Sequence, residues 1–251
     1  SVAVSVDGGT VAVGATIGDG KVTNSGTAYV YRWNGSSYVQ APELKADDGA
    51  ANDNFGVSVT VSSDGSTVVV GANADDSNKG STYVYRWNGS SYTQEQKLTA
   101  GDGAANDNFG HRVAVSADGG TVAVGATMGD GRVVDCGSVY VYRWNGSSWV
   151  ETKLWASDGA GSDFFGQSVA VSADGSMVVT GAYGHDSSKG SAYVYQWNGS
   201  SYDQSRKLVL SNGLANDYFG WCVAVSADGG TVAVGANIGY HEHFSVWVYA
   251  E

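Results

Sequence analysis

The chain has 251 residues, of which 42% are hydrophobic and 15% charged. Its 37 glycines, 15 tyrosines and 8 tryptophans, beside a single proline, are typical of an all-β protein with many tight turns. The formal net charge of -12 repels nucleic acid and acidic membrane surfaces, and no apolar run approaches the roughly 20 residues that span a bilayer, so we expect neither a nucleic-acid partner nor membrane insertion.

The sequence repeats itself at intervals of about 54 residues. Each full copy contains Phe-Gly, a valine-rich run, Asp-Gly, Gly-Ala, Tyr-Val-Tyr and Trp-Asn-Gly-Ser-Ser, and a fifth copy is shorter. The repeats span about 1–54, 55–108, 109–164, 165–218 and 219–251, with the Phe-Gly pairs at Phe55, Phe109, Phe165 and Phe219. Such units cannot bury their apolar faces alone, so we expect them to pack into one domain, 1–251. A residue present in every copy is expected to hold the fold rather than to catalyse a reaction.

Four strands are predicted in each full repeat, here in chain order for the third copy. The first strand is 113–116, an Asp-Gly turn at 117–120 follows, and the second strand is 121–126. A polar loop of variable length leads to the third strand, 138–144, and Asn145-Gly146 then turns the chain into the fourth strand, 148–154. Because Asn-Gly is the preferred type I′ hairpin dipeptide, we expect both of these residues to have positive φ.

Four-stranded meanders at this period predict a β-propeller, in which each repeat forms one antiparallel blade. A β-solenoid would have a shorter period, and helical repeats would need a 3.6-residue pattern that is absent from the sequence. The single proline, Pro42, is placed in a fourth strand, at a blade edge where a missing N–H costs no ladder hydrogen bond. The prediction is therefore an all-β propeller of about five four-stranded blades, the last lacking its outer strand.

The last repeat supplies only three strands, so its third strand is expected to be an exposed edge. The residues of this edge that we expect to promote assembly are Phe244, Val246 and Val248. An apolar edge invites pairing, so we expect a partner strand, or chain beyond Glu251, to cover it. At the other end, Ser1–Ser5 aligns with Ser168–Ser172, and we expect a Phe-Gly pair to precede it in the natural protein.

The repeated motifs resemble the FG-GAP repeats of integrin-α-like propellers over essentially the whole chain. The motifs that carry the resemblance are Phe-Gly-x-Ser-Val-Ala-Val-Ser, Val-x-Val-Gly-Ala, Gly-Ser-x-Tyr-Val-Tyr-x-Trp and Lys-Leu-x-Ala-x-Asp-Gly-Ala-x-x-Asp-x-Phe-Gly. The chain is most similar to the subgroup with a short turn between the first and second strands. The resemblance implies a secreted or cell-surface, non-enzymatic interaction domain whose partner is a protein or a glycan.

One feature departs from the integrin-type repeat. That repeat carries an Asp-x-Asp-x-Asp-Gly calcium loop between its first two strands, whereas this chain has only a short turn with one carboxylate, at Asp7, Asp64, Asp118, Asp174 and Asp228. One carboxylate cannot supply the several oxygens that calcium requires. The family's calcium sites are therefore not transferred to this chain, which also has no Arg-Gly-Asp sequence, and we predict no cofactor.

Acidic loops between the repeats leave a weaker calcium hypothesis open. Two carboxylates about five residues apart could share an ion in each loop, but Asp commonly caps backbone N–H groups in such turns, which is the interpretation we favour. The candidates are Asp48, Asp53, Asp102, Asp107, Asp158 and Asp163, with Asp75 and Asp76 in a variable loop. His185-Asp186 and His241-Glu242-His243 stand in other variable loops, and His241 with His243 could chelate a transition metal. No nucleophilic serine context, phosphate loop or cysteine pair of zinc spacing is present, so we expect no enzyme.

Two kinds of covalent modification are suggested by the sequence. The Asn-Gly-Ser turns are N-glycosylation acceptors at Asn34, Asn88, Asn145 and Asn198, and we expect at least two of them to carry sugar if the chain passes through a eukaryotic secretory pathway. Cys136 and Cys222 stand at non-equivalent positions of the repeat, so unpaired thiols are favoured over a disulfide.

Three functions are compatible with these features. The first is an adhesion or recognition propeller outside the cell, supported by the family resemblance and by loops that vary among the copies. The second is a structural subunit of an extracellular filament, sheath or surface layer, completed by contacts with copies of itself. The third is a glycan-binding lectin that uses aromatic and polar residues, although most of the repeated aromatic residues are needed for the core.

Overall fold

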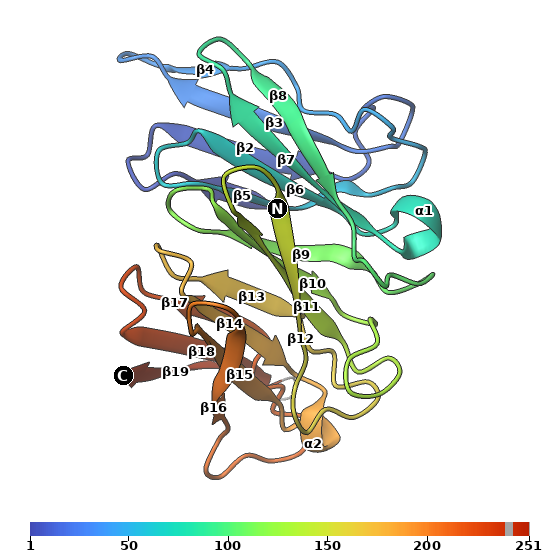
Figure 1. The fold of residues 1–251 in the computed structure, drawn as a ribbon, viewed down its shortest axis with the longest axis vertical. Coiled ribbons are helices and arrows are strands. Elements are labelled where there is room, and N and C mark those ends of the chain that lie inside the picture. Colours follow the sequence, from blue (N-terminus) through green and yellow to red (C-terminus); the bar gives the residue numbers. More distant parts are fainter. Residues whose placement is uncertain (239–242, 251) are drawn as a thin grey trace. The chain divides into compact units, whose positions relative to one another are not determined.

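The computed structural model describes residues 1–238 and 243–250, without the side chains of residues 238 and 243–245. It consists of antiparallel sheets, with two short helical turns, α1 (Asp75–Asn78) and α2 (His185–Ser188) (Figure 1). Residues with positive φ interrupt both turns, so neither is a regular α-helix. The chain divides into two compact units, 1–122 and 123–251, and each is described by itself. Among the described residues, no helix has the length and apolar character needed to cross a bilayer.

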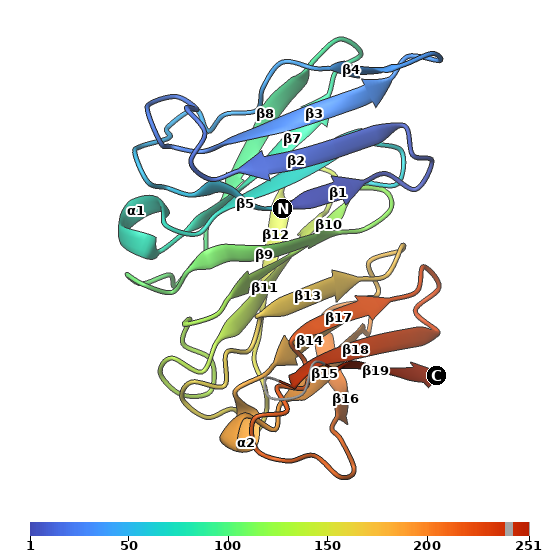
Figure 2. The same ribbon diagram turned by 180° about the vertical axis from the view of Figure 1, so that it is seen from behind.

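The sheets follow one another along the chain, and each is a meander in which consecutive strands pair. The first two sheets are β1 (Val2–Val4), β2 (Thr10–Ala15), β3 (Thr27–Trp33), β4 (Tyr38–Gln40), and β5 (Phe55–Val61), β6 (Thr67–Ala72), β7 (Ser81–Trp87), β8 (Tyr92–Leu98). The third is β9 (Phe109–Val115), β10 (Thr121–Ala126), β11 (Ser138–Trp144), β12 (Trp149–Leu154). The fourth is β13 (Ser168–Val171), β14 (Met177–Ala182), β15 (Ser191–Trp197), β16 (Tyr202–Leu208). The last has β17 (Cys222–Val225), β18 (Thr231–Ile238) and β19 (His243–Ala250), which Figure 2 shows side by side.

This arrangement confirms the predicted all-β propeller class, with one four-stranded blade per repeat and three strands in the last described sheet. Two local predictions were wrong. Pro42 lies outside the fourth strand, because β4 ends at Gln40. The Asn-Gly hairpins are four-residue loops, in which only the glycine has positive φ, such as Gly146 at 99°. The asparagine keeps negative φ because its side-chain Oδ1 accepts the N–H groups of the two serines that follow the glycine, as Asn145 does from Ser147 and Ser148.

The Phe-Gly and Gly-Ala pairs fasten each repeat to the next. The glycine of Phe-Gly has φ near +90°, as at Gly220 (91°), a conformation that L side chains rarely adopt. Its backbone lies directly against the glycine of Gly-Ala in the preceding repeat, and a Cβ atom on Gly181 would stand 1.8 Å from the Gly220 carbonyl oxygen. The neighbouring Phe219 is fully buried, as are its three counterparts. Both motifs are therefore explained by close backbone approach between adjacent sheets.

The short turn between the first two strands uses its single carboxylate internally. Asp174 Oδ1 accepts hydrogen bonds from the Ser172 hydroxyl (2.7 Å) and the Ser176 N–H (2.9 Å). Ser172 in turn accepts the N–H of Met177 at 2.9 Å. The same pattern recurs in the other four repeats. The aspartates that replace the integrin-type calcium loop therefore stabilise a turn.

An arginine on the third strand of one sheet contacts the next sheet. Arg143 donates to the Gly175 carbonyl and to the Tyr202 hydroxyl, both at 2.8 Å, and its guanidinium lies 4.6 Å from the centre of the Trp197 ring. Arg32 makes the same set of contacts in the first unit, with Gly65, Tyr92 and Trp87. These contacts join adjacent repeats within each unit.

Strand β19 is an edge of the last sheet among the described residues. Its backbone pairs with β18 from His243↔Ile238 to Ala250↔Thr231. Val246 and Val248 are 64% and 68% exposed, as predicted for an uncovered third strand. The backbone of Phe244 belongs to this strand, whereas its side chain lies outside the described residues.

Candidate functional site

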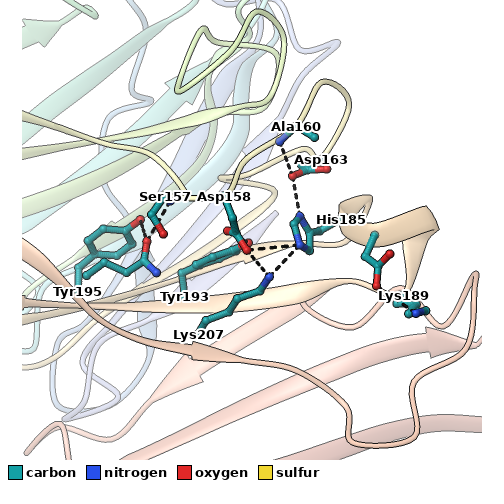
Figure 3. A network of polar contacts seen from close by, with 11 residues as sticks. Ser157, Asp158, Ala160, Asp163, His185, Lys189, Tyr193, Tyr195 and Lys207 are labelled. Atoms are coloured by element: carbon teal, nitrogen blue, oxygen red, sulfur yellow. Dashed lines mark hydrogen bonds and ion pairs between the residues drawn. The ribbon is translucent and has the colours of Figure 1, made fainter.

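A polar network lies where the third and fourth repeats meet (Figure 3). Lys207 on β16 donates to Asp158 Oδ2 at 2.5 Å and to His185 Nε2 at 2.8 Å. Because Nε2 accepts from the lysine, the His185 proton lies on Nδ1, which donates to Asp163 Oδ2 at 2.7 Å. Tyr193 on β15 donates to the other oxygen of Asp158 at 2.9 Å. The network therefore joins an inter-repeat loop to three elements of the following repeat.

The first unit contains the equivalent network between its first two repeats. Lys97 donates to Asp48 at 2.5 Å, and Tyr83 donates to the other oxygen of Asp48 at 2.9 Å. In place of the histidine stands Asp75, which pairs with Lys97 at 2.6 Å and accepts from the Ser81 hydroxyl at 2.5 Å. The lysine is therefore held by two carboxylates in the first unit and by one carboxylate and the Nε2 atom of an imidazole in the second.

Burial and pairing act in opposite directions on the acids of these networks. Burial raises the pKa of Asp158, but hydrogen bonds from Lys207 and Tyr193 outweigh it, so the pKa is below its ordinary value, and Asp48 behaves in the same way. Burial raises the pKa of Asp53, and its turn hydrogen bond only partly opposes this effect. Burial lowers the pKa of Lys97, but hydrogen bonds to Asp48 and Asp75 reverse the sign and raise it. Lys97 and Asp48 are thus both stabilised in their charged forms.

The carboxylates suggested as calcium ligands have protein partners in this structure. Asp53, Asp107 and Asp163 each accept the backbone N–H of the residue three positions earlier, at 2.6 to 2.8 Å, which is the capping interpretation. Asp76 pairs with Lys79 at 3.1 Å. No group of three or more His, Cys, Asp or Glu side chains suited to a metal ion occurs among the described residues. His241 and the side chain of His243 lie outside those residues.

The pockets beside the two networks are small and equivalent. One of about 220 Å³ is lined by residues that include His185, Lys189 and Lys207, and one of about 200 Å³ by residues that include Asp75 and Lys97. Because the polar side chains described here bond to one another across adjacent repeats, we interpret the networks as fasteners between the repeats. Asp102, the remaining carboxylate suggested as a calcium ligand, lies in the loop between β8 and β9.

The four candidate glycosylation sites lie at the surface, and the two cysteines are unpaired. Asn34, Asn88, Asn145 and Asn198 all stand in exposed hairpin loops. Cys136 is buried and Cys222 is exposed, and both thiols are free, as the sequence favoured.

A second candidate site is an aromatic cluster confined to the second unit, defined as Phe164, Tyr183, Tyr218 and Trp221. Phe164 and Tyr183 are stacked, with ring centres 5.0 Å apart and planes inclined by 6°. Tyr183 also contacts Trp221 at 4.9 Å and Tyr218 at 5.9 Å. All four rings are at least partly exposed, and Trp221 is 38% exposed. They lie where the first strands begin and where β14 ends, at one end of two adjacent sheets.

The cluster occupies positions that are polar or small in other repeats. Asn54 and Asn73 stand where the fourth sheet has Phe164 and Tyr183, and their amide groups are 3.4 Å apart. Gly184 stands where the second repeat has Ala74, and a Cβ atom there would stand 2.2 Å from the Ser162 carbonyl oxygen and 3.0 Å from the Phe164 ring. The Asn54–Asn73 amide pair of the second repeat is thus replaced by the stacked Phe164–Tyr183 pair in the fourth sheet.

Two members of the cluster have a strained backbone. Phe164 and Tyr218 have φ of 56° and 52°, at a position that Asn54 and Asn108 fill in earlier repeats. Asparagine adopts this left-handed conformation readily, whereas an aromatic residue loses about 1 kcal/mol or more there. This cluster could not be predicted from the residues that the repeats share, and the signal for it lies at the positions where the repeats differ.

Comparison with known proteins agrees with the fold. A family model described as FG-GAP repeat matches residues 38–85, 92–142, 149–195 and 202–246, which is more than half of the chain. Each match runs from the fourth strand of one sheet to the third strand of the next, so it includes the inter-repeat contacts described above. No curated protein is significantly similar to the chain.

Solved structures similar to this one include three that share the fold at low sequence identity. A putative TolB from Agrobacterium tumefaciens has a TM-score of 0.57 at 15% identity, with 100% of this chain and 76% of that chain covered. A functionally unknown protein from Desulfotomaculum acetoxidans has a TM-score of 0.55 at 12% identity, covering 100% and 69%. Sqt1 from Chaetomium thermophilum has a TM-score of 0.57 at 20% identity, covering 93% and 54%.

Proposed function

The chain belongs to the FG-GAP repeat family, and from that premise we propose that it is a non-enzymatic interaction domain that acts outside the cell, either secreted or at the cell surface. Its partner is a protein or a glycan, and it serves in adhesion or recognition. The repeated residues described above are occupied in joining one sheet to the next, which leaves the residues that differ among repeats to provide specificity.

One observation carries this proposal: the aromatic cluster of the second unit. Phe164, Tyr183, Tyr218 and Trp221 come from three separate segments, differ from most of their counterparts in other repeats, and remain partly exposed. Exposed tyrosine and tryptophan are the residues most enriched in binding surfaces. A cluster that served packing alone would be expected to be buried.

The location is tested with an antibody against the chain, applied to intact cells of the source organism and to their medium. We expect surface labelling or secreted protein. Detection only after the cells are lysed would contradict the proposal. In a eukaryotic host, mass spectrometry of the secreted protein is expected to find sugar on at least two of Asn34, Asn88, Asn145 and Asn198.

A second function, that of a structural subunit in an extracellular assembly, is favoured by the uncovered edge of β19. Beside it is a pocket of about 510 Å³ whose lining includes Leu210, Trp247 and Tyr249. Tyr193 and Tyr195 of the fourth sheet are the counterparts of Trp247 and Tyr249, and both are buried in that sheet, which has a fourth strand. A strand from another copy that paired with β19 would cover the pocket and the edge together.

Light scattering over a range of protein concentrations tests this second function. Assembly predicts a mass that rises with concentration and a return to the monomer mass on Val248→Lys, since a lysine on an edge strand opposes pairing. Val134→Lys adds the same charge at an equally exposed position (68%) in the loop between β10 and β11, and is the control for nonspecific effects of charge. A concentration-independent monomer would exclude assembly.

A further inference from the structure

We infer that the aromatic cluster of the second unit is a carbohydrate-binding platform, on which the apolar face of a neutral sugar ring stacks. This inference rests on the proposed function, because it names the class of partner that the extracellular domain binds. The residues that form the platform are Trp221 and Tyr183, with Tyr218 at the margin and Phe164 as the support beneath Tyr183.

The geometry of the rings favours a ligand that lies on an outer face. The centres of neighbouring rings in the cluster are 4.9 to 6.4 Å apart, so the rings contact one another. No space is left between them for an ammonium or guanidinium group enclosed by several rings, as in an aromatic cage. Trp221 is 38% exposed, so part of its indole is open to a ligand that approaches from solvent.

The rim of the platform is polar. The hydroxyl groups of Tyr183 and Tyr218 and the indole N–H of Trp221 supply hydrogen-bond donors around the apolar faces. Tyr218 already bonds to the side-chain oxygen of Asn216, at 3.4 Å. Pyranose rings have the matching chemistry, with a patch of C–H groups on one face and hydroxyl groups around the edge.

The charge near the platform selects among sugars. Asp217, which is partly buried, precedes Tyr218, and the whole chain carries a net charge of -12. This negative charge repels sialylated, sulfated and uronic-acid glycans. The expected ligands are therefore neutral oligosaccharides.

The chain provides its own template for a variant that removes the platform. The double substitution Phe164→Asn with Tyr183→Asn recreates the Asn54–Asn73 pair of the earlier repeat, including an asparagine in the left-handed conformation it prefers. Trp221→Val introduces the residue found at the equivalent Val57. Trp144→Ala is the matched control, since Trp144 is also exposed, at 41%, but stands at the C-terminal end of β11, next to the Asn145-Gly146 turn.

The experiment screens the purified chain on a microarray of neutral and sialylated oligosaccharides and titrates the best ligand by calorimetry. We expect neutral glycans to bind, a loss of at least about tenfold in affinity for Trp221→Val and for the double variant, and unchanged affinity for Trp144→Ala. Circular dichroism and thermal melting confirm that each variant is folded. Failure to bind any neutral glycan, or equal binding by all variants, would overturn the inference.

The remaining outcomes separate this inference from the proposed function. Oligo-arginine peptides are titrated in parallel, and peptide binding that is lost in Trp221→Val while no glycan binds would replace the sugar with a cationic protein partner. That result overturns the carbohydrate inference but leaves an extracellular interaction domain in place. Absence of the protein from the cell surface and the medium would instead contradict the proposed function, whatever the microarray shows.

Discussion

At the scale of single residues, the same side chain types have different tasks according to their position in the repeat. Asp174 caps a turn, Asp163 caps a loop and bonds to a histidine, and Asp158 pairs with a lysine of the following repeat. The bonds of Asp163 to the histidine and of Asp158 to the lysine both join two adjacent repeats. Aspartate content alone therefore says little about metal binding in this chain.

The first prediction concerns Arg143. Replacement by alanine removes two hydrogen bonds from a charged donor and the contact with Trp197, and we expect a loss of about 2 kcal/mol in the free energy of unfolding. Arg143→Lys should restore part of this loss, since lysine keeps the charge but not the planar fork. Urea unfolding followed by circular dichroism measures both variants. Arg132→Ala, at an exposed position, is the control, and an equal loss there would contradict the assignment.

The second prediction concerns Asp158 and pH. Its pKa is lowered in the folded protein from an ordinary value of 3.8, so its ionised form contributes stability above that value and loses it as the pH falls through the lowered one. The difference in urea midpoint between the wild type and Asp158→Asn should thus be greatest at pH 7. It should begin to shrink below pH 3.8 and should vanish once the pH is below the lowered pKa of Asp158 in the folded protein. Asp48→Asn should show the same dependence. A difference independent of pH would show that the charge is not responsible.

At the scale of elements, the sequence predicted the strands well and the turns less well. The repeats give several views of the same strand pattern, and the buried Phe-Gly and Gly-Ala pairs mark each sheet, so the meander could be inferred without a structure. The hairpins at Asn145 differ because side-chain hydrogen bonds to Ser147 and Ser148 decide the turn, and dipeptide preferences do not include them. The fastening of Asp158 by Lys207 joins residues 49 positions apart, which periodicity does not reveal.

The third prediction tests the backbone contact between sheets. A Cβ atom on Gly181 would stand 1.8 Å from the Gly220 carbonyl oxygen. Gly181 is paired in the β14 ladder, and Gly220 accepts from the Ser168 hydroxyl and donates its N–H to Gly235, so a shift of either backbone disturbs existing hydrogen bonds. We expect Gly181→Ala to destabilise the protein by about 3 kcal/mol, at the upper end of the usual cost of overpacking. Gly161→Ala is the control, because its added methyl group would meet only one atom, at 3.5 Å. Similar unfolding midpoints for the two variants would contradict the role given to the Gly-Ala pair.

At the scale of the whole molecule, repetition and departure from it have separate roles. The contacts that recur, from Phe-Gly to the arginine and lysine fasteners, build the sheets into units. The contacts that occur once, above all the stacking of Phe164 on Tyr183, provide the surface on which the proposed function depends. Of the first set, the Phe-Gly and Gly-Ala pairs could be recognised in the sequence because they recur. The arginine and lysine contacts and the aromatic cluster were recognised only when distant segments were seen together.

The last prediction concerns calcium, which the acidic loops left open. The candidate carboxylates described above pair with lysine, tyrosine or backbone N–H groups, so an ion would have to displace these partners. We therefore expect the melting temperature to change by less than about 1 °C between excess chelator and 10 mM calcium chloride. A site with a dissociation constant of about 0.1 mM would instead add about 2.7 kcal/mol at that concentration, which raises the melting temperature of a chain of this size by roughly 5 to 10 °C. Such a rise, abolished by Asp53→Asn, would replace the capping interpretation with a calcium site in the loops between repeats.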